Sequence, residues 1–231
     1  MTFQSIPVSL IVMYLLLIPC VVLYLHFKFS KREFLATATK GLSAWIILAG
    51  ALFAAQGNTL GMFATLIIAG LAMGMAGDIA LSLPKPGFTS GMLFFGLGHI
   101  CYIIAMILIS DSIIYAVAAF ILLYSVYLLA YYKLKIVPPE NLRVPIIAYS
   151  IIITFMLSLA MTMPFTKFPG GLLLLFSGAL FTASDVMLAF NNHPIIKKIT
   201  PGKKSKNLLG IVSLVCYFTA QSLFAISVYL F

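Results

Sequence analysis

The chain has 231 residues, of which 63% are hydrophobic and only 8% are charged, and its mean hydropathy is +1.15. A soluble domain carries about 25% charged residues, so this composition excludes an ordinary cytosolic protein and a disordered one. The net charge of +9 would suggest a nucleic-acid partner in a soluble protein. Here the basic residues stand between apolar segments, where they set membrane orientation. We expect no nucleic-acid partner and a single membrane domain covering residues 1–231.

Apolar runs separated by polar or Pro/Gly-containing breaks predict eight membrane-spanning helices. These fall near residues 7–25, 41–56, 59–83, 88–109, 112–132, 144–163, 170–190 and 208–231. The predicted fold class is therefore an all-α polytopic membrane protein. The first residues carry no positive charge ahead of the apolar run, unlike a secretory signal, so the first segment is predicted to be a retained helix.

The distribution of Lys and Arg predicts that both termini lie outside. With this orientation the outer side holds one basic residue, Lys167. The inner side then holds Lys28, Lys31, Arg32, Lys40, Lys85, Lys133, Lys135, Arg143, Lys197, Lys198, Lys203, Lys204 and Lys206. A missed span would invert every later loop, so this asymmetry supports the count of eight. We expect a bacterial inner membrane rather than the endoplasmic reticulum.

Two segments four helices apart resemble each other. Ala76-Gly77-Asp78-Ile79-Ala80-Leu81 ends the third predicted helix, and Ala183-Ser184-Asp185-Val186-Met187-Leu188 lies near the end of the seventh. A duplication of four helices keeps the orientation of each copy, so it would give a 4+4 parallel repeat. The match is short, and chance similarity is the alternative.

Three ionisable side chains lie within the predicted spans: Asp78, His99 and Asp185. A charged group in hydrocarbon costs about 2.5–3.5 kcal/mol on insertion scales, so such residues usually face a cavity or a partner. Both aspartates lie roughly 8–9 Å inside the cytoplasmic boundary at 1.5 Å per residue. In a shared water-filled cleft, burial and mutual repulsion would leave one of them protonated as a general acid. The alternative is that each carboxyl caps a broken helix or bonds Ser and Thr neighbours.

Other polar groups in the spans have two interpretations each. His99 is either a neutral hydrogen-bonding residue or a catalyst, and Lys40 is either an orientation determinant at the start of the second helix or a contact for a lipid phosphate. Four further side chains could line the cleft or bond a helix interface: Tyr102, Tyr149, Tyr217 and Gln221. A stripe of glycines on the third helix is typical of close helix packing; it consists of Gly70, Gly74 and Gly77.

Metal and cofactor chemistry is not indicated. Cys20, Cys101 and Cys216 fall inside apolar segments without paired ligand spacing. The three histidines lack a His-x3-His pair, which argues against a zinc hydrolase. The sequence contains no Gly-x-Ser-x-Gly segment, the motif that would predict a serine nucleophile. We expect neither a metal nor a cofactor.

The sequence resembles the YhhN family of integral-membrane lysoplasmalogenases. The resemblance runs from about residue 40 to the end of the chain. It is carried by Gly77-Asp78 with Leu81, by Gly96, Gly98, His99 and Tyr102, by Tyr149, by Ser184-Asp185 with Leu188-Ala189, and by Tyr217 with Ala220-Gln221. The chain departs from the family pattern at Lys40-Gly41, where the family has Lys-Pro, and this departure bears on how the second helix begins.

The resemblance implies eight spans, no metal, and two membrane aspartates as the catalytic pair. It also implies hydrolysis of the vinyl-ether bond of a lysoplasmalogen to a fatty aldehyde and glycerophosphocholine or glycerophosphoethanolamine. The partners would then be a lysophospholipid within the bilayer and the surrounding lipids. Proton-coupled transport fits duplicated halves and membrane carboxylates as well, and a non-catalytic lipid-binding or scramblase-like protein is a third hypothesis. Neither the headgroup preference nor the oligomeric state follows from the sequence.

Overall fold

The structure, a computed structural model, describes residues 8–55, 61–83, 87–111, 113–133, 138, 140–190 and 203–230. In this part of the chain, eight helices are long and apolar enough to cross a membrane. They are α1 (Val8–Phe29), α2 (Glu33–Ala54), α3 (Met62–Leu81), α4 (Gly87–Leu108), α5 (Ile113–Lys133), α6 (Arg143–Thr162), α7 (Gly171–Phe190) and α9 (Lys203–Tyr229). Two short 3₁₀ turns flank α6: η1 (Glu140–Leu142) and η2 (Met163–Phe165). The predicted eight-span, all-α membrane fold is confirmed.

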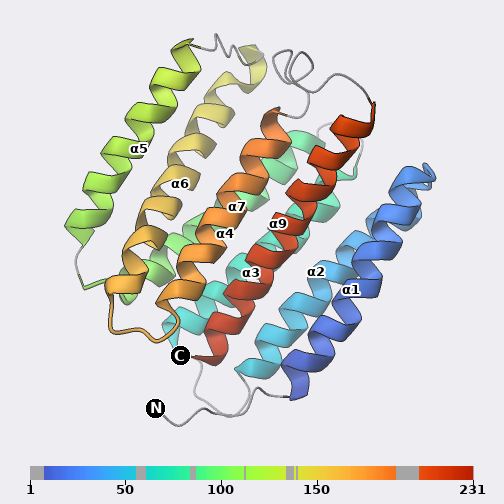
Figure 1. The fold of residues 1–231 in the computed structure, drawn as a ribbon, viewed down its shortest axis with the longest axis horizontal. Helices are drawn as coiled ribbons and strands as arrows, with labels where there is room; N and C mark the ends of the chain where they lie inside the picture. Colours follow the sequence, from blue (N-terminus) through green and yellow to red (C-terminus); the bar gives the residue numbers. More distant parts are fainter. Residues whose placement is uncertain are drawn as a thin grey trace.

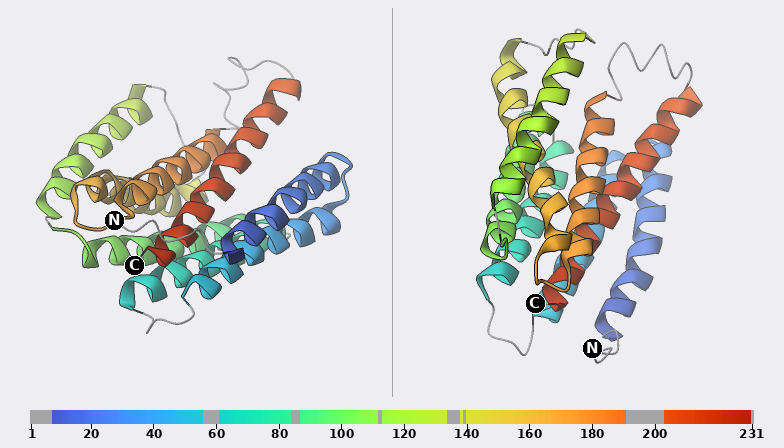
Figure 2. Two further views of the ribbon diagram at one scale, coloured as in Figure 1. Left: turned by 60° about the horizontal axis from the view of Figure 1, so that its bottom comes forward. Right: turned by 60° about the vertical axis from the view of Figure 1, so that its left-hand side comes forward.

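The eight helices lie alongside one another, with the start of α1 and the end of α9 at the same end of the bundle (Figure 1). Helices α3, α4, α7 and α9 form the central group, because α3 packs on α4 and α9, while α7 packs on α9. The α1–α2 pair closes one side and the α5–α6 pair the other (Figure 2). The cavity described below lies at the end opposite the termini, which is the end predicted to face the cytoplasm.

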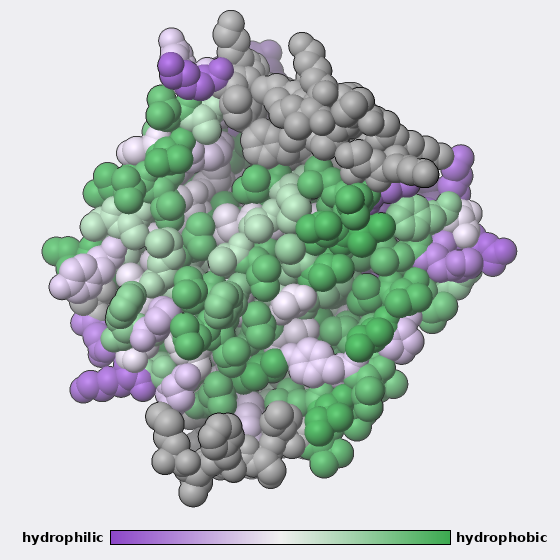
Figure 3. Space-filling model, viewed as in Figure 1, coloured by the Kyte–Doolittle hydropathy of each residue, from purple (hydrophilic) through white to green (hydrophobic). Residues whose placement is uncertain are grey.

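The outer surface is apolar, as a lipid-facing surface must be. Helix α5 has a single buried side chain among its described residues, that of Ala116. Ile114 and Leu122 on the same helix are 68% and 67% exposed. Figure 3 shows hydrophobic side chains across the middle of the molecule and hydrophilic ones toward its edges. This distribution matches a bundle whose flanks contact hydrocarbon and whose ends contact water.

Glycines allow α3 and α4 to approach each other closely. A Cβ added at Gly98 of α4 would lie 3.0 Å from the carbonyl oxygen of Gly70 on α3, and one added at Gly77 would lie 2.9 Å from Cε2 of Phe95. The predicted packing role of the α3 stripe is thus confirmed for Gly70 and Gly77. Gly74 differs, since it faces α9, where the Gln221 amide occupies the space a Cβ would need.

Three helix boundaries differ from the prediction by four or more residues. The second helix begins at Glu33 instead of 41, α1 continues to Phe29 instead of 25, and α9 begins at Lys203 instead of 208. The start of α2 was missed because Glu33, Thr37, Thr39 and Lys40 interrupt the apolar pattern of its first two turns. Thr37 and Thr39 satisfy their hydroxyls within the helix, by donating to the carbonyls of Glu33 and Leu35 at 3.0 and 2.7 Å.

The predicted orientation is compatible with this arrangement, because an even number of spans places the two termini on one side. Its other support lies partly outside the described residues, which leave out Lys85, Lys135, Lys197 and Lys198. The outside location of the termini therefore stays a prediction.

The glycine contacts give a test of helix packing. We expect Gly98→Ala to destabilise the bundle by about 1–3 kcal/mol, the usual range for overpacking, because the new Cβ meets a backbone oxygen that cannot rotate away. The matched control is Gly41→Ala on α2, where the Cβ would meet Ile79 at an ordinary 3.8 Å. Thermal unfolding in detergent should show a lower Tm for the first variant and an unchanged or higher Tm for the second. Equal Tm values would contradict the packing account.

Candidate active site between two aspartates

A polar cavity of about 90 Å³ lies among α1, α2, α3, α4, α7 and α9. Its lining consists of Tyr24, Lys28, Lys40, Asp78, Leu81, Phe95, Ser184, Asp185, Leu188, Gly210, Ser213, Leu214 and Tyr217. Both membrane aspartates are in this set, one from α3 and one from α7. The structure therefore places both carboxyl groups at one cavity.

The first aspartate, Asp78, is fully enclosed and held by two partners. Its side chain is 1% exposed, and Oδ1 lies 2.7 Å from Nζ of Lys40 on α2. The Tyr217 hydroxyl of α9 donates to Oδ2 at 2.8 Å. An ammonium and a hydroxyl donor together favour the carboxylate form and offset part of the desolvation of a buried charge.

A chain of hydrogen bonds continues from Asp78 into the bundle. The Gln221 amide donates to the Tyr217 hydroxyl oxygen at 3.0 Å, and the Tyr102 hydroxyl of α4 donates to Oε1 of Gln221 at 2.9 Å. The Lys40 ammonium also lies over the Tyr217 ring, 5.7 Å from its centroid. Four helices are thus tied together around one ion pair, which fixes the direction in which Asp78 points.

The second aspartate, Asp185, belongs to a separate cluster. The Tyr149 hydroxyl of α6 donates to Oδ2 of Asp185. Nε2 of His99, on α4, lies 2.9 Å from the Tyr149 oxygen and 3.4 Å from the same Oδ2. His99 is fully buried, whereas the Asp185 side chain is 16% exposed. Asp185 is therefore the more accessible of the two carboxyl groups.

The geometry of this cluster constrains where its protons can be. When the Tyr149 hydroxyl donates to Asp185, Nε2 of His99 must carry a hydrogen to bond the Tyr149 oxygen. Nδ1 of His99 is buried and has no hydrogen-bond partner among the described residues. The alternative pattern has a protonated Asp185 donating to Tyr149, which in turn donates to Nε2. A coordinated shift of two protons interconverts the two patterns when Nδ1 carries a hydrogen, so that His99 is an imidazolium in the first pattern and a neutral imidazole in the second.

Aromatic rings fill the space between the two clusters. The Phe181 ring of α7 contacts His99 with centroids 4.6 Å apart and Tyr217 with centroids 5.4 Å apart. Phe95 packs edge-on against both Phe181 and Tyr217. Phe181 thus lies between His99 of one cluster and Tyr217 of the other.

The structure brings all nine predicted site residues into one region, where five line the cavity and four lie behind the lining. Lys40, Asp78, Ser184, Asp185 and Tyr217 line the cavity. The other four lie behind this lining, in the hydrogen-bond networks: His99, Tyr102, Tyr149 and Gln221.

Ser184 has a structural contact of its own. Its hydroxyl is 3.2 Å from that of Ser213 on α9, and the Ser213 hydroxyl donates to the Ser184 carbonyl at 3.0 Å. This pair joins α7 to α9 directly beside Asp185.

One part of the prediction needs correction. Lys40 does not open the second helix at the boundary; it lies inside α2, and its side chain is 15% exposed. The reason is the paired carboxylate, which lets the ammonium lie inside the bundle. The two aspartates have unlike partners: an ammonium for Asp78, a phenol and an imidazole for Asp185.

Sequence reasoning missed the contribution of α1. Tyr24 and Lys28 line the cavity, and the Lys28 ammonium lies 5.4 Å from the Tyr24 ring centroid. The signal was available, because residues four apart share one face of a helix. Ser213 was also missed; nothing in its local sequence distinguishes it from other serines in spans.

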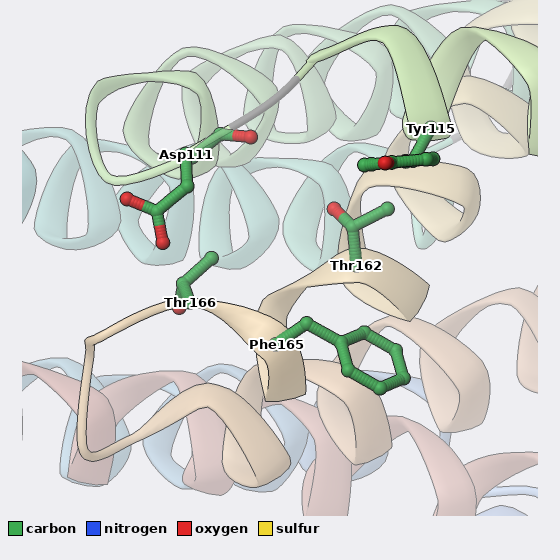
Figure 4. A pocket seen from close by; sticks show the side chains of 6 residues that line it. Asp111, Tyr115, Thr162, Phe165 and Thr166 are labelled. Carbon is green, nitrogen blue, oxygen red and sulfur yellow. The ribbon is translucent and has the colours of Figure 1, made fainter.

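Metal ligation and cavity size do not define this site. In the part of the chain that the structure describes, no three His, Cys, Asp or Glu side chains gather as metal ligands would. A larger hollow, of about 450 Å³, lies at the opposite end of the bundle among Ser110, Asp111, Tyr115, Thr162, Phe165 and Thr166 (Figure 4). Asp111 is the one ionisable carboxyl in that lining, and none of the predicted site residues reaches it. Converging titratable groups, not volume, mark the candidate active site.

An eight-helix membrane bundle with two carboxyl groups in one polar cavity is the class of protein that fold and site define. The family comparison gives the particular family: the YhhN family matches residues 35–228, and the chain belongs to it. The match covers α2 through α9 and so includes every helix that contributes a predicted site residue. Neither curated proteins nor solved structures gave a match.

The ion pair provides a test of the site's architecture. We expect Lys40→Met to destabilise the protein by about 3–5 kcal/mol, the usual effect of leaving a buried charge without its partner. Because the double variant Lys40→Met/Asp78→Leu removes both charges, it should recover most of that loss. Denaturant unfolding of the parent, the two single variants and the double variant in detergent measures the coupling. Additive losses would show that the two side chains do not interact.

Proposed function

We propose that the protein is a lysoplasmalogenase-like hydrolase that cleaves the vinyl-ether bond of a lysoplasmalogen. The products are a fatty aldehyde and a glycerophosphocholine or glycerophosphoethanolamine. The observation that carries the proposal is the pair of aspartates in one cavity, one in an ion pair with Lys40 and the other bonded to Tyr149. Membership of the YhhN family supports the same reaction class.

Vinyl-ether hydrolysis requires one acid and one stabilising anion. A proton added to the β-carbon leaves the α-carbon and the ether oxygen sharing a positive charge as an oxocarbenium ion. Water then attacks the α-carbon, loses a proton to a base, and forms a hemiacetal. The hemiacetal collapses to an aldehyde and the free hydroxyl of glycerol. The net reaction consumes one water and returns the acid to its starting form.

The unlike surroundings of the two carboxyls support a division of these roles. The Lys40 ammonium and the Tyr217 hydroxyl favour the carboxylate form of Asp78, so we take it as the anion that stabilises the oxocarbenium ion. Asp185 is partly exposed, and among the described residues its ion-pair contact is with His99, which is a cation only when it is protonated. It is therefore the proton donor. This division parallels the paired carboxylates of glycosidases, whose transition state is also oxocarbenium-like.

Tyr149 and His99 give the acid a route for its proton. After Asp185 has donated to the β-carbon, it becomes the base that accepts a proton from the attacking water. The alternative hydrogen-bond pattern passes a proton between Asp185 and Nε2 of His99 through the Tyr149 hydroxyl. Such a relay would keep Asp185 protonated while the hemiacetal collapses.

Proton-coupled transport is the alternative that membrane carboxylates also fit. Alternating access works best around a site near the bilayer midplane. Asp78 instead precedes the end of α3 by three residues and Asp185 precedes the end of α7 by five, or about 5 and 8 Å at 1.5 Å per residue. This position near one end of the bundle favours the hydrolase.

Removal of either carboxyl tests the catalytic pair. We expect Asp185→Asn and Asp78→Asn each to lower kcat at least about 100-fold, in line with the loss of a general acid or of its stabilising charge. Aldehyde release from a lysoplasmalogen by purified protein in detergent is the readout. Asp111→Asn, an exposed carboxyl at the other end of the bundle, is the matched control and should match the parent. A folded parent that releases no aldehyde would contradict the proposal and favour transport.

The relay is tested separately. Tyr149→Phe keeps the ring but removes the hydroxyl that joins Asp185 to His99, so we expect kcat to fall about tenfold or more, with KM little changed. Tyr127→Phe, on α5 and away from the cavity lining, controls for the loss of a phenol in a span. A Tyr149→Phe variant with the parent's kcat would show that Asp185 exchanges its proton with water directly.

A further inference from the structure

The site described above is too small for the whole substrate. A cavity of about 90 Å³ has room for about three waters at roughly 30 Å³ each. It can admit the reacting bond and the attacking water. The hydrocarbon chain that follows the vinyl ether must therefore lie elsewhere, and it must begin close to Asp185.

A groove of about 370 Å³ runs between α4 and α6 on the flank of the bundle. We call it the α4–α6 groove and define it by Met92, Gly96 and Ile100 of α4 with Ala148, Tyr149 and Ile152 of α6. Its volume is more than twice the roughly 150 Å³ of an apolar cavity that holds benzene. The groove and the cavity share no lining residue, but they are linked by a hydrogen bond: Tyr149 lines the groove, and its hydroxyl donates to Asp185, which lines the cavity.

We propose that the α4–α6 groove holds the hydrocarbon chain of the lysolipid and that Tyr149 marks the point where the chain meets the acid. The identity of the lipid rests on the proposed function. Gly96 supplies the space at this point: it has no side chain, and even a Cβ there would lie 3.7 Å from Cδ2 of Tyr149. A chain in the groove would pass beside the Tyr149 ring, with its first carbons next to Asp185.

The polarity of the groove matches a lipid in one orientation. Thr89 and Ser90 lie at the end near the start of α4, which is also the end of the bundle that holds the cavity. From there the lining becomes apolar toward Ile100, eleven residues or about 16 Å further along the helix. Leu93 and Leu97 are exposed on this flank at 62% and 42%, so the groove faces hydrocarbon and a chain can enter from the membrane.

The first experiment maps the chain directly and does not depend on turnover. The probe is a lysophosphatidylcholine with a saturated chain and a diazirine at the chain end, photolysed with the full-length protein in detergent. We expect the label on peptides from 88–100 and 144–152, competed by unlabelled lysolipid. Label spread over α5, or label that unlabelled lysolipid does not displace, shows surrounding lipid only and overturns the proposal.

The second experiment fills the groove. Ala148→Trp and, from the other wall, Leu97→Trp should lower kcat/KM at least about tenfold for a hexadecenyl substrate but less than about threefold for an octenyl one, because the lost contacts lie along the chain. Ala118→Trp, an exposed alanine on α5, is the matched control and should change neither. Equal losses for both substrates, or none in either groove variant, overturn the proposal.

The two proposals fail in distinguishable ways. A parent that releases no aldehyde while the probe labels the groove, and loses that label in Ala148→Trp, contradicts the hydrolase but supports the groove as a lipid-chain site. An active parent whose probe labels another flank overturns the groove and leaves the hydrolase standing.

Discussion

Lys40 and Asp78 form their ion pair inside the helix bundle, 2.7 Å apart and almost shielded from solvent, and the site is organised around that contact. Either charge alone would be expensive in a medium of low dielectric. Together, and with the Tyr217 hydroxyl on the second carboxylate oxygen, they tie α2, α3 and α9 to one point. The pair also makes the two aspartates chemically different. One carboxyl is paired with an ammonium, and the other is bonded to a phenol and lies beside an imidazole.

Helix packing provides the space and the precision that this arrangement needs. Glycines bring the backbones of α3 and α4 close together, and Gly74 leaves room for the Gln221 amide that bonds Tyr217 and Tyr102. The rings of Phe95 and Phe181 pack against Tyr217 and His99 between the two clusters. In the proposed reaction, such a rigid shell would hold the acid and the anion at fixed positions, which is a main contribution of a protein to acid-catalysed hydrolysis.

Hydropathy predicted the number and approximate location of the helices, because hydrocarbon imposes length and composition on every span. It also singled out Asp78, His99 and Asp185, since ionisable groups in spans are rare enough to stand out. It also placed Lys40 at a helix end, because a charged residue beside an apolar run is taken as the boundary of the span. Only the partner of Lys40, Asp78, 38 positions later in the chain, explains why the charge lies inside the helix. The α4–α6 groove was beyond prediction, because it depends on how side chains from two helices pack and not on a pattern along either one.

The central claim is that a carboxyl group in this cavity protonates the β-carbon of a vinyl ether, and the origin of the new hydrogen in the product tests it most directly. Purified protein is incubated with a lysoplasmalogen in D₂O. The aldehyde is trapped at once as an oxime, and its deuterium content is measured by mass spectrometry. The account predicts one deuterium per aldehyde, on the carbon next to the carbonyl, with slower release than in H₂O. Aldehyde without deuterium at that carbon, or no aldehyde from folded protein, would contradict it.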